Sequence, residues 1–460
     1  MSRFALFLVL VAPLACAAEP LPVVPLPPVL AGYLETALRA NLALQREQRD
    51  ADSAQARLDA ARGALLPRVD LAARYTASRG GRTIEFPVGD LLNPVYRSVD
   101  ALSGTSRFPT LENQSIAFLR REEQETKLRL IQPLYRPELS RGHEAARAET
   151  AAASLSVAAF KRELRLAVVR GYFRWQQARA AVDILASATD LTHEALRVNR
   201  ALVAADAATE DAVLRVEAEV QGIRQQHLAA EADLALAQAY FNVILDRPAD
   251  AVIDATDPAE LERLLAALRP LAASRPRAGG EREELAALER AGQAADHAAR
   301  AARSAQRPTL SLAVESGIQG SSYRHSPGAG FTQASLVAEW NLFDGRRSGS
   351  RERQARNEQA KVDARRSEVQ RQLSLQADDA WRRFVVAVAS LDAARSRQTA
   401  ARRVFQFVSR RNREGLVNQL GYLDARHELT SAELNEAATR SALFIAHAEL
   451  DRALVLSPLP

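Results

Sequence analysis

Cysteine and methionine are almost absent from this chain of 460 residues, which holds one of each, Cys16 and Met1. Both lie in an N-terminal segment with the pattern of an export signal. We therefore expect no disulfide and no cysteine-based metal site in the mature chain. Aromatic residues make up 5% of the chain and hydrophobic residues 47%. Alanine supplies much of that hydrophobic content, which favours closely packed helices over cores filled by large rings.

Long apolar runs are also lacking. Beyond the N-terminus, no continuous apolar stretch has the length of a transmembrane helix. If the chain enters a membrane, we expect it to do so as β-strands. The formal net charge of +5 is spread along segments in which basic residues are interleaved with Asp and Glu. This interleaving predicts solvated helix surfaces and no nucleic-acid partner.

Motifs for catalysis and cofactor binding are missing as well. The seven histidines form no HxxxH pair or other metal-spaced cluster. The sequence contains no G-x-S-x-G, Walker or GxGxxG motif. The acidic residues Glu122, Glu123 and Glu125 fall in an expected surface loop, and we interpret them as solvated. We expect no enzyme activity, no metal site and no cofactor.

The N-terminus has the three parts of a secretory signal peptide. Arg3 is basic, Phe4 to Ala12 are mostly apolar, and Ala15-Cys16-Ala17 suits cleavage. A membrane anchor is the alternative, but the apolar run is short for one. A lipidated Cys16 is a second alternative, although Pro13 stands where a lipidation motif usually has Leu. We predict export, with residues 1–17 as the signal peptide.

The chain repeats itself. The segment LRLAVVRGYFRWQQARAAVD from Leu164 resembles LSLQADDAWRRFVVAVASLD from Leu373, at a constant offset of 209 residues. An upstream pair, LLPRVDLAARYTAS from Leu65 and QRPTLSLAVESGIQ from Gln306, is offset by 241. The change in offset indicates that one loop differs in length between two copies of the same unit.

Each copy contains two short alternating segments that predict β-strands. Val69, Leu71, Ala73 and Tyr75 would lie on one face of the first strand, and Asp70, Ala72 and Arg74 on the other. Such alternation over about ten residues is typical of outer-membrane barrel strands, although a sheet on a soluble core gives the same pattern. Four strands cannot close a barrel, which needs about eight. Membrane insertion would therefore require several chains.

The remaining sequence of each copy is helical. Residues 140–202 contain no proline, and some 60 residues at helical rise span on the order of 90 Å. The matching helix covers residues 346–413. Its apolar positions have coiled-coil spacing, and they are Leu373, Ala377, Trp381, Phe384, Val388 and Leu391.

These helices would turn back at two tips. Gly415 suits a positive φ at one tip, and Asp206 occupies the equivalent position at the other. Thr209 is a candidate N-cap for the first return helix.

The expected organisation is mainly α with a small β part. Its segments are a signal peptide (1–17), a proline-rich lead-in (18–30), a first repeat (31–245, loop 79–126, tip near 203–210), a connector (246–281), a second repeat (282–455, loop 320–330, tip near 413–421) and a tail (456–460). At the second junction, Leu336 to Leu342 would form the last strand. Asp344-Gly345 would then turn the chain into the long helix.

In this arrangement the chain resembles the TolC-like outer-membrane efflux protein family. The resemblance rests on the segment from Tyr33 to Leu71, the strand-to-helix junctions, the tip EGLVNQLGYLDARHELTSAEL from Glu414, and the duplication. It implies a homotrimer in the outer membrane of a Gram-negative bacterium. Each protomer would give four antiparallel strands to a trimeric 12-stranded β-barrel, continued by an α-helical periplasmic tunnel.

The resemblance also implies a function and partners. Such proteins are exit ducts of tripartite efflux pumps or type I secretion systems. They work with a periplasmic adaptor and an inner-membrane transporter, and they catalyse nothing. The alternative is a periplasmic coiled-coil adaptor or scaffold. The sequence does not reveal the substrate, because selectivity in such systems lies mostly in the inner-membrane pump.

Site residues follow from the same resemblance. Asp424 matches one of two acidic positions that constrict the periplasmic end of some relatives, whereas Gly421 stands at the other and departs from the pattern. Glu210 and Asp211 would add negative charge, although acids are favourable at any helix N-terminus. Adaptor contacts are expected at Gly415, Leu416, Asp206 and Ala207. The expected lipid-facing residues are Val69, Leu71, Tyr75, Leu310, Leu312, Leu336 and Trp340.

Overall fold

A computed structural model of the protein describes residues 24–206, 209–275, 278, 280–323, 328–414 and 419–459. The expected signal peptide, residues 18–23 of the lead-in, and the tip residues Ala207, Gly415 and Leu416 lie outside these ranges. The chain divides into two compact units. One comprises residues 1–55, 148–293 and 360–460, and the other residues 56–147 and 294–359.

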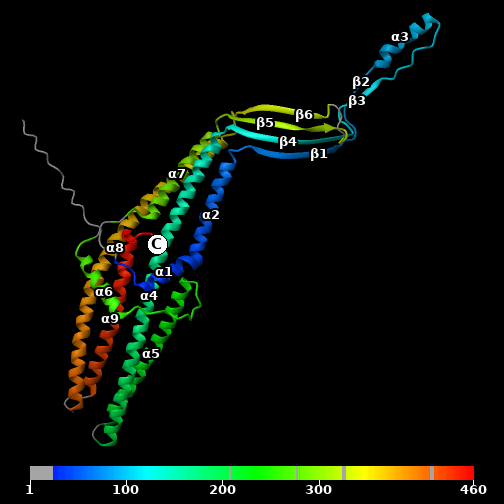
Figure 1. Ribbon diagram of the computed structural model, residues 1–460. Helices are drawn as coiled ribbons and strands as arrows, with labels where there is room; N and C mark the ends of the chain where they lie inside the picture. Colours follow the sequence, from blue (N-terminus) through cyan, green and yellow to red (C-terminus); the bar gives the residue numbers. More distant parts are fainter. Residues whose placement is uncertain are drawn as a thin grey trace, which may run out of the picture. The chain divides into compact units, whose positions relative to one another are not determined.

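The fold is mainly helical, with a small antiparallel sheet (Figure 1). The helices are α1 (Pro28–Ala40), α2 (Leu42–Gly63), α3 (Val88–Ser103), α4 (Pro137–Ala204), α5 (Glu210–Ile244), α6 (Pro258–Leu268), the 3-10 helix η1 (Arg269–Ala273), α7 (Glu283–Ser304), α8 (Arg347–Arg413) and α9 (Gln419–Leu454). The strands are β1 (Arg68–Ala77), β2 (Thr83–Phe86), β3 (Gln114–Ala117), β4 (Glu122–Tyr135), β5 (Thr309–Gly320) and β6 (Gly330–Glu339). Among the described helices, none has the length and apolarity to cross a bilayer.

The two halves repeat the same long helical hairpin. Helices α4 and α8 start at residues 137 and 347 and end at 204 and 413. Their return helices, α5 and α9, start at residues 210 and 419. These spacings of 209 or 210 residues match the offset in the sequence. The connector between the halves contains α6, whose start is capped by the Asp257 side chain accepting from the Ala259 amide at 3.1 Å.

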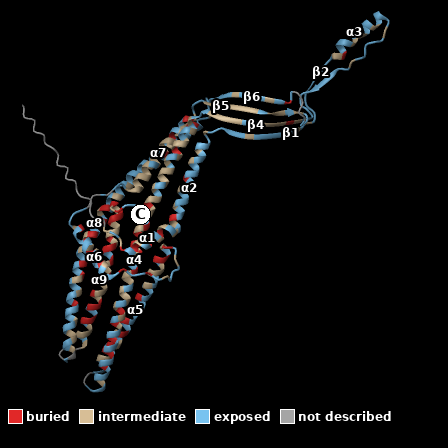
Figure 2. Cartoon of the chain, viewed as in Figure 1, coloured by how far each residue is buried: buried red, intermediate tan, exposed pale blue. Residues whose placement is uncertain are grey.

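The core of the helical unit gathers many of the scarce aromatic residues. Phe173 of α4 stacks on Phe444 of α9, with ring centroids 4.3 Å apart, and Tyr172 is fully buried beside Phe241. The expected stripe on α8 packs here too, with Phe384 and other members in the main core cluster. Figure 2 shows the buried residues concentrated along the helices, whereas the strands and α3 are mostly exposed or intermediate. Large rings thus fill the places where several alanine-rich helices meet.

A polar residue joins α1 and α2 to the rest of the helical unit. Asn41, between the two helices, donates from its side chain to the Ile244 carbonyl at 2.9 Å. Its side-chain oxygen accepts from the Leu44 amide at 3.0 Å and caps the start of α2. The Asn41 backbone N–H ends α1 on the Ala37 carbonyl, while its side chain starts α2 and links it to the end of α5.

The four long strands form one antiparallel sheet in the order β1-β4-β5-β6. Leu71 lies opposite Leu128, and Leu312 lies opposite Leu336. Because side chains alternate between faces, the register places the predicted apolar residues of β1, β5 and β6 on one face. On the sheet as described, the outer edges of β1 and β6 have no strand partner.

The other face of the sheet carries a ladder of charges. Arg74 of β1 pairs with Glu125 of β4 at 3.2 Å, and Lys127 bridges Glu125 at 2.9 Å and Glu315 of β5 at 3.1 Å. Arg129 also reaches Glu315, at 3.0 Å. Opposite charges on neighbouring strands stabilise their pairing, so this ladder ties three of the four strands together.

Several expected boundaries are wrong. The predicted loop 79–126 contains β2, α3 and β3, and β4 already begins at Glu122. The cluster Glu122, Glu123 and Glu125 is therefore part of a strand, where it pairs with residues 74–77 of β1. The last strand covers Gly330–Glu339 rather than residues 336–342, so Trp340 lies just beyond it. The lead-in is shorter than expected, because α1 already begins at Pro28.

The junction into α8 is a turn, as predicted. Gly345 has φ 68° and Arg346 φ 71°. Asp344 accepts from the Ser348 amide at 2.8 Å and also from the Ser348 hydroxyl. This hydrogen bonding lowers the pKa of Asp344, so its charge is kept at the start of the helix, where an anion is favourable. The first copy begins its helix with Pro137 instead, which suits the first helical position.

We predict that Gly317→Val disrupts the sheet. A Cβ at Gly317 would lie 2.3 Å from the Thr126 carbonyl oxygen and 2.7 Å from Lys127 Cα, so the β4–β5 pairing must shift. We expect a destabilisation of about 3 kcal/mol and a marked loss of folded protein, measured by thermal unfolding and yield.

Gly330→Val in β6 is the matched control, because a Cβ there meets only the Gly317 carbonyl at 3.9 Å. Equal losses from both substitutions would show that β-branched residues are harmful anywhere in this sheet. The close approach at Gly317 would then have no special role.

Candidate functional site

The first hairpin tip carries three of the predicted site residues. Asp206 follows α4 with φ 55°, the left-handed conformation expected at this position. Glu210 and Asp211 are exposed in the first turn of α5. Among the described residues, Asp211 forms a 3.6 Å ion pair with Arg215 on its own helix. Thr209 precedes α5, but its side chain makes no capping hydrogen bond.

The second tip places Asp424 on α9, also exposed. Its neighbours Tyr422 and Leu423 pack against a cluster formed by Val216, Val220, Ala195 and Leu196 of the first hairpin. The structure thus brings the beginning of α9 against the α4–α5 hairpin. No hydrogen bond or ion pair within the described residues links Asp424 to Glu210 or Asp211. The predicted adaptor residues Gly415, Leu416 and Ala207 are outside the described residues.

The sequence pattern near this tip does not identify one unusual residue, Arg426. Arg426, two positions after Asp424, is only 6% exposed, and its Nε and Nη2 have no hydrogen-bond partner among the described residues. Its guanidinium lies 5.5 Å from the centre of the Phe405 ring. Burial lowers the pKa of Arg426, while the charge of Glu433 opposes that shift. A buried cation with free donors is costly, and a cation–π contact offsets the cost only in part.

The predicted lipid-facing residues fall into two groups. Val69, Leu71, Tyr75 and Leu336 are exposed on the apolar face of the sheet. Leu310 and Leu312 are partly buried on the same face, within the central strand β5. Trp340 is exposed beyond the end of β6, and its indole nitrogen donates to the Gln306 carbonyl at 3.0 Å. That bond holds the ring beside the start of β5.

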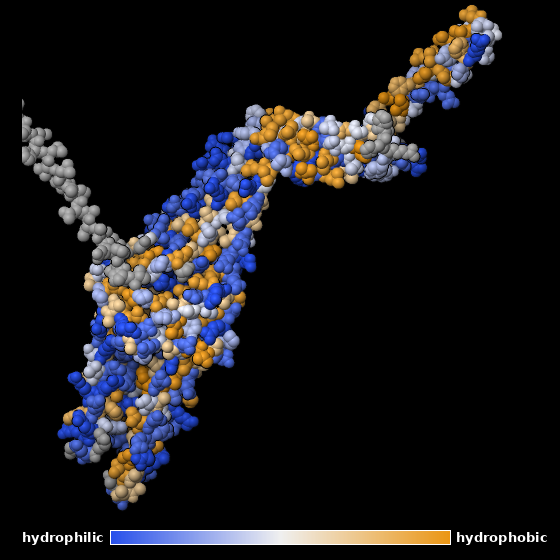
Figure 3. All heavy atoms as spheres, viewed as in Figure 1, coloured by the Kyte–Doolittle hydropathy of each residue, from blue (hydrophilic) through white to orange (hydrophobic). Residues whose placement is uncertain are grey.

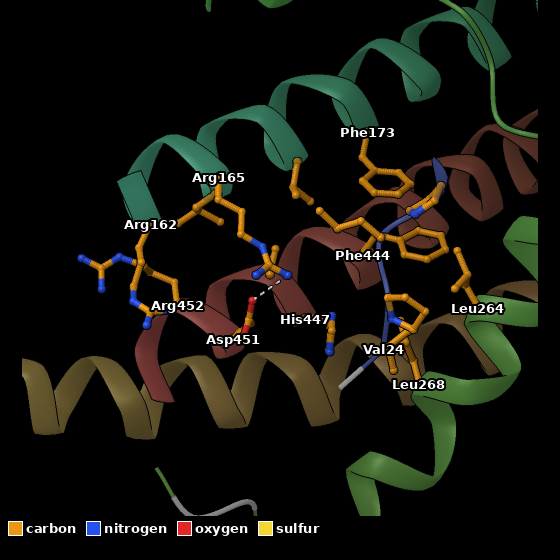
Figure 4. Close-up of a pocket in the computed structure, with 16 residues that line it drawn as sticks. Val24, Arg162, Arg165, Phe173, Leu264, Leu268, Phe444, His447, Asp451 and Arg452 are labelled. Atoms are coloured by element: carbon orange, nitrogen blue, oxygen red, sulfur yellow. Dashed lines mark ion pairs between the residues drawn. The ribbon is translucent and has the colours of Figure 1, made fainter. Parts of the chain in front are cut away.

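A cavity of about 40 Å³ lies among α4, α9, α6 and the residues before α1 (Figure 4). Its charged lining residues are already paired. Arg165 meets Asp451 at 3.3 Å, and Arg162 donates to Glu283 and to the Ser457 carbonyl. A space of this size holds a few waters at most. The cavity is therefore part of the helical core and offers no substrate site.

Two ionisable groups in this region have strongly shifted pKa values. Burial lowers the pKa of His447 to about 4, against the opposing charge of Asp451. Glu284 is partly buried, which raises its pKa, but hydrogen bonding from Arg282 and the charge of Arg452 lower it to about 2 overall. Across the described residues, no group of His, Cys, Asp and Glu is arranged to hold a metal ion.

We predict that Arg426→Met stabilises the isolated protein, by about 1–3 kcal/mol, because an unpaired buried charge is replaced by an apolar chain of similar length. Thermal unfolding followed by circular dichroism measures the change. Arg397→Met is the control, since Arg397 is exposed and paired with Glu428 at 2.9 Å. Its loss should change stability by less than about 1 kcal/mol. A strong destabilisation by Arg426→Met would contradict this prediction and would mean that the buried guanidinium contributes favourably to the fold.

His447 predicts a specific pH dependence. Its folded pKa of about 4 lies below the usual value of 6.5, so the unfolded chain binds the extra proton between these values. Stability should therefore rise with pH across this window and level off above it. From pH 7.5 to pH 5 we expect a loss of up to about 2 kcal/mol.

His447→Gln should remove that part of the loss in thermal unfolding. Glu284 stays ionised over the same range, so it does not contribute. His193→Gln, at an exposed position of α4, is the matched control. An unchanged pH profile in His447→Gln would contradict the assignment.

Comparison with known proteins adds to these observations. Residues 276–454 match the family of outer membrane efflux proteins. No curated protein sequence matches the chain. Solved structures match across nearly its whole length. The outer-membrane channel OprN has a TM-score of 0.75 at 19% identity, covering 94% of this chain and 91% of that one.

Two further channels give the same result. CmeC of Campylobacter jejuni has a TM-score of 0.75 at 14% identity, covering 93% of this chain and 86% of its own. The open state of MtrE of Neisseria gonorrhoeae has a TM-score of 0.73 at 19% identity, covering 93% and 89%. Residues 276–454 are therefore similar to the outer membrane efflux protein family, and the chain as a whole has the fold of these solved outer-membrane channels.

Proposed function

We propose that the protein is an outer-membrane channel of a Gram-negative bacterium. It would be the exit duct for a periplasmic adaptor and an inner-membrane transporter, in a tripartite efflux pump or a type I secretion system. The observation that carries this proposal is the four-stranded sheet. It has an exposed apolar face, a charged face and two edges without a strand partner in the described chain.

The sheet requires more than one copy of the chain. In a bilayer, every backbone donor and acceptor needs a partner, so an open sheet edge is not tolerated. Pairing β6 of one copy with β1 of the next satisfies both edges. Three copies supply twelve strands, enough for a closed barrel with an aqueous lumen. The apolar face, with Leu71 and Leu336, would meet lipid, and the ladder around Lys127 would line the lumen.

The helical unit also leaves surfaces that suit assembly. Helix α5 exposes large apolar side chains along its length, namely Leu228, Leu236, Tyr240 and Val243. Exposed apolar residues in such a stripe usually mark a protein interface. In a trimer, this stripe would pack on a neighbouring protomer and close the wall of a tunnel.

The hairpin tips would form the periplasmic entrance. Asp424, Glu210 and Asp211 all lie near the start of a return helix and are exposed. Three copies would place rings of negative charge around the axis, as in other cation-selective constrictions. The tip residues Gly415, Leu416, Asp206 and Ala207 would contact the adaptor.

A periplasmic adaptor or scaffold is the second candidate. Its long coiled-coil hairpins would look similar at the sequence level. An adaptor, however, has no need of a sheet with one largely apolar exposed face, and such a face would promote aggregation in the aqueous periplasm. The sheet therefore favours the channel.

Membrane fractionation tests this proposal. We expect the protein in the outer-membrane fraction and a trimer band in SDS gels that disappears on boiling. Purified protein in planar bilayers should form ion-conducting pores. A soluble monomer without pore activity would contradict the proposal and would favour the adaptor.

We predict that Asp424→Asn weakens the cation selectivity of the pore, by about twofold, because three charges leave the entrance at once. The reversal potential in a salt gradient measures the change. Glu428→Gln is the control, since Glu428 lies one turn further along α9 and is paired with Arg397. Equal shifts in both variants, or none in Asp424→Asn, would remove Asp424 from the entrance.

A further inference from the structure

The segment between β1 and β4 is a folded extension, defined as residues 78–121. Asn93 of α3 exchanges two hydrogen bonds with the backbone of Leu111, both 2.8 Å long. Asp90 accepts from the Asn113 side chain at 2.9 Å, and Tyr96 stacks on Phe108 at 4.9 Å. One side of α3 is thus fixed to the returning chain.

Gly89 permits this close packing. A Cβ there would lie 2.3 Å from the Leu111 carbonyl oxygen, so only glycine lets α3 approach the returning chain. The extension is therefore a built element of the protein, with a defined packed side.

The opposite side of α3 is apolar and uncovered in the protomer. Its large side chains follow helical spacing, and they are Leu91, Val95, Val99 and Leu102. Leu102 is 89% exposed. Figure 3 shows hydrophobic residues along much of the extension, to which Ile84, Phe86, Ile116 and Phe118 contribute as further exposed residues. An apolar surface of this kind on a soluble segment marks an interaction site.

The chain path indicates which side of the membrane this surface occupies, if the proposed function holds. The long helices join β1 at Arg68 and leave β4 at Tyr135, so they mark the periplasmic side. The extension connects the other ends of the same strands. Backbone hydrogen bonds from Ser78 to Arg121 and from Phe118 to Arg82, both 2.9 Å, continue the pairing into it. It therefore lies at the outer mouth of the channel.

Lipid is a poor partner for α3. The ten residues of β1 already match a tilted span of the hydrocarbon core. Arg79, Arg82, Arg120 and Arg121 follow directly after β1 or precede β4, and all four are exposed. Arginines at this level suit the phosphate-bearing head groups. Helix α3 begins beyond them, outside the acyl chains.

A second copy of α3 fits better. Each protomer has one long outer connection, the extension, and one short one, residues 321–329 between β5 and β6. A trimer closed through β1 and β6 would arrange three extensions around one axis, separated by short connections. We propose that the three α3 helices pack against one another through Leu91, Val95, Val99 and Leu102 and form a cap over the outer mouth. Apolar residues at this spacing are those that helices bury against each other.

Site-specific crosslinking tests the cap. In a Cys16→Ala background, the chain has no other cysteine. Val95→Cys lies on the apolar face, and Arg97→Cys is exposed on the opposite side of the same helix. A short bismaleimide applied to intact cells should produce a covalent dimer with Val95→Cys and none with Arg97→Cys. A single position on a threefold axis gives dimers, because each reagent joins two thiols.

The contrary outcomes are distinct. No dimer with Val95→Cys, together with labelling by a water-soluble maleimide as fast as for Arg97→Cys, would overturn the cap. A photoactivatable lipid that labels Val95→Cys would assign the face to the membrane and would also overturn it. In both cases a boiling-sensitive trimer band would show that the proposed channel remains. Loss of that band in both variants and in the Cys16→Ala parent would instead contradict the proposed function.

A functional measurement complements the crosslinks. Leu102→Glu would place three like charges at the contact and should separate the helices without disturbing the fixed side of α3. We expect a higher open-state conductance than in the parent protein. Arg97→Glu is the matched control and should leave the conductance unchanged. No difference between these two variants would mean that α3 does not obstruct the mouth.

Discussion

The two unpaired edges of a four-stranded sheet are the constraint on which this structure depends. Antiparallel pairing joins β1, β4, β5 and β6, but among the described residues the outer sides of β1 and β6 have no strand partner. In water such edges invite aggregation, and in a bilayer they are not tolerated. Closure by other copies removes the problem. The apolar face of the sheet also favours assembly, because Leu71 and Leu336 are exposed in the protomer and are more stable in a nonaqueous environment.

The charged face of the sheet stabilises the strand register within a single protomer. Lys127 bridges two glutamates on two different strands, and Gly317 lets the backbones of β4 and β5 come close beside it. A slip by one residue would move these charges to the apolar face, which strongly disfavours it. The helical unit is stabilised in another way. A few aromatic residues, such as Phe173 and Phe444, fix the contacts among helices that otherwise present alanine.

Periodicity explains how much of this was predictable. The duplication and the strands around Leu71 and Leu312 follow from spacing alone, since offset and alternation survive in one sequence. Helix α3 could not be predicted from spacing, because Pro94 lies inside it and the short flanking strands carry little alternation. The start of β4 was missed for a related reason, as both its faces are polar near Glu122. The burial of Arg426 could not be predicted from the sequence, because it depends on neighbours such as Phe405 that are distant in sequence.

The differences between the two halves say more about function than their similarity. A duplicated unit satisfies the same physical demands twice, so the shared order of strand and helix explains the scaffold. Some positions differ between the halves or carry an energetic cost. The left-handed turn at Asp206 is less favourable than a glycine would be, Arg426 is buried without full hydrogen bonding, and only the first half carries the extension 78–121. Strain and unsatisfied groups persist where function retains them.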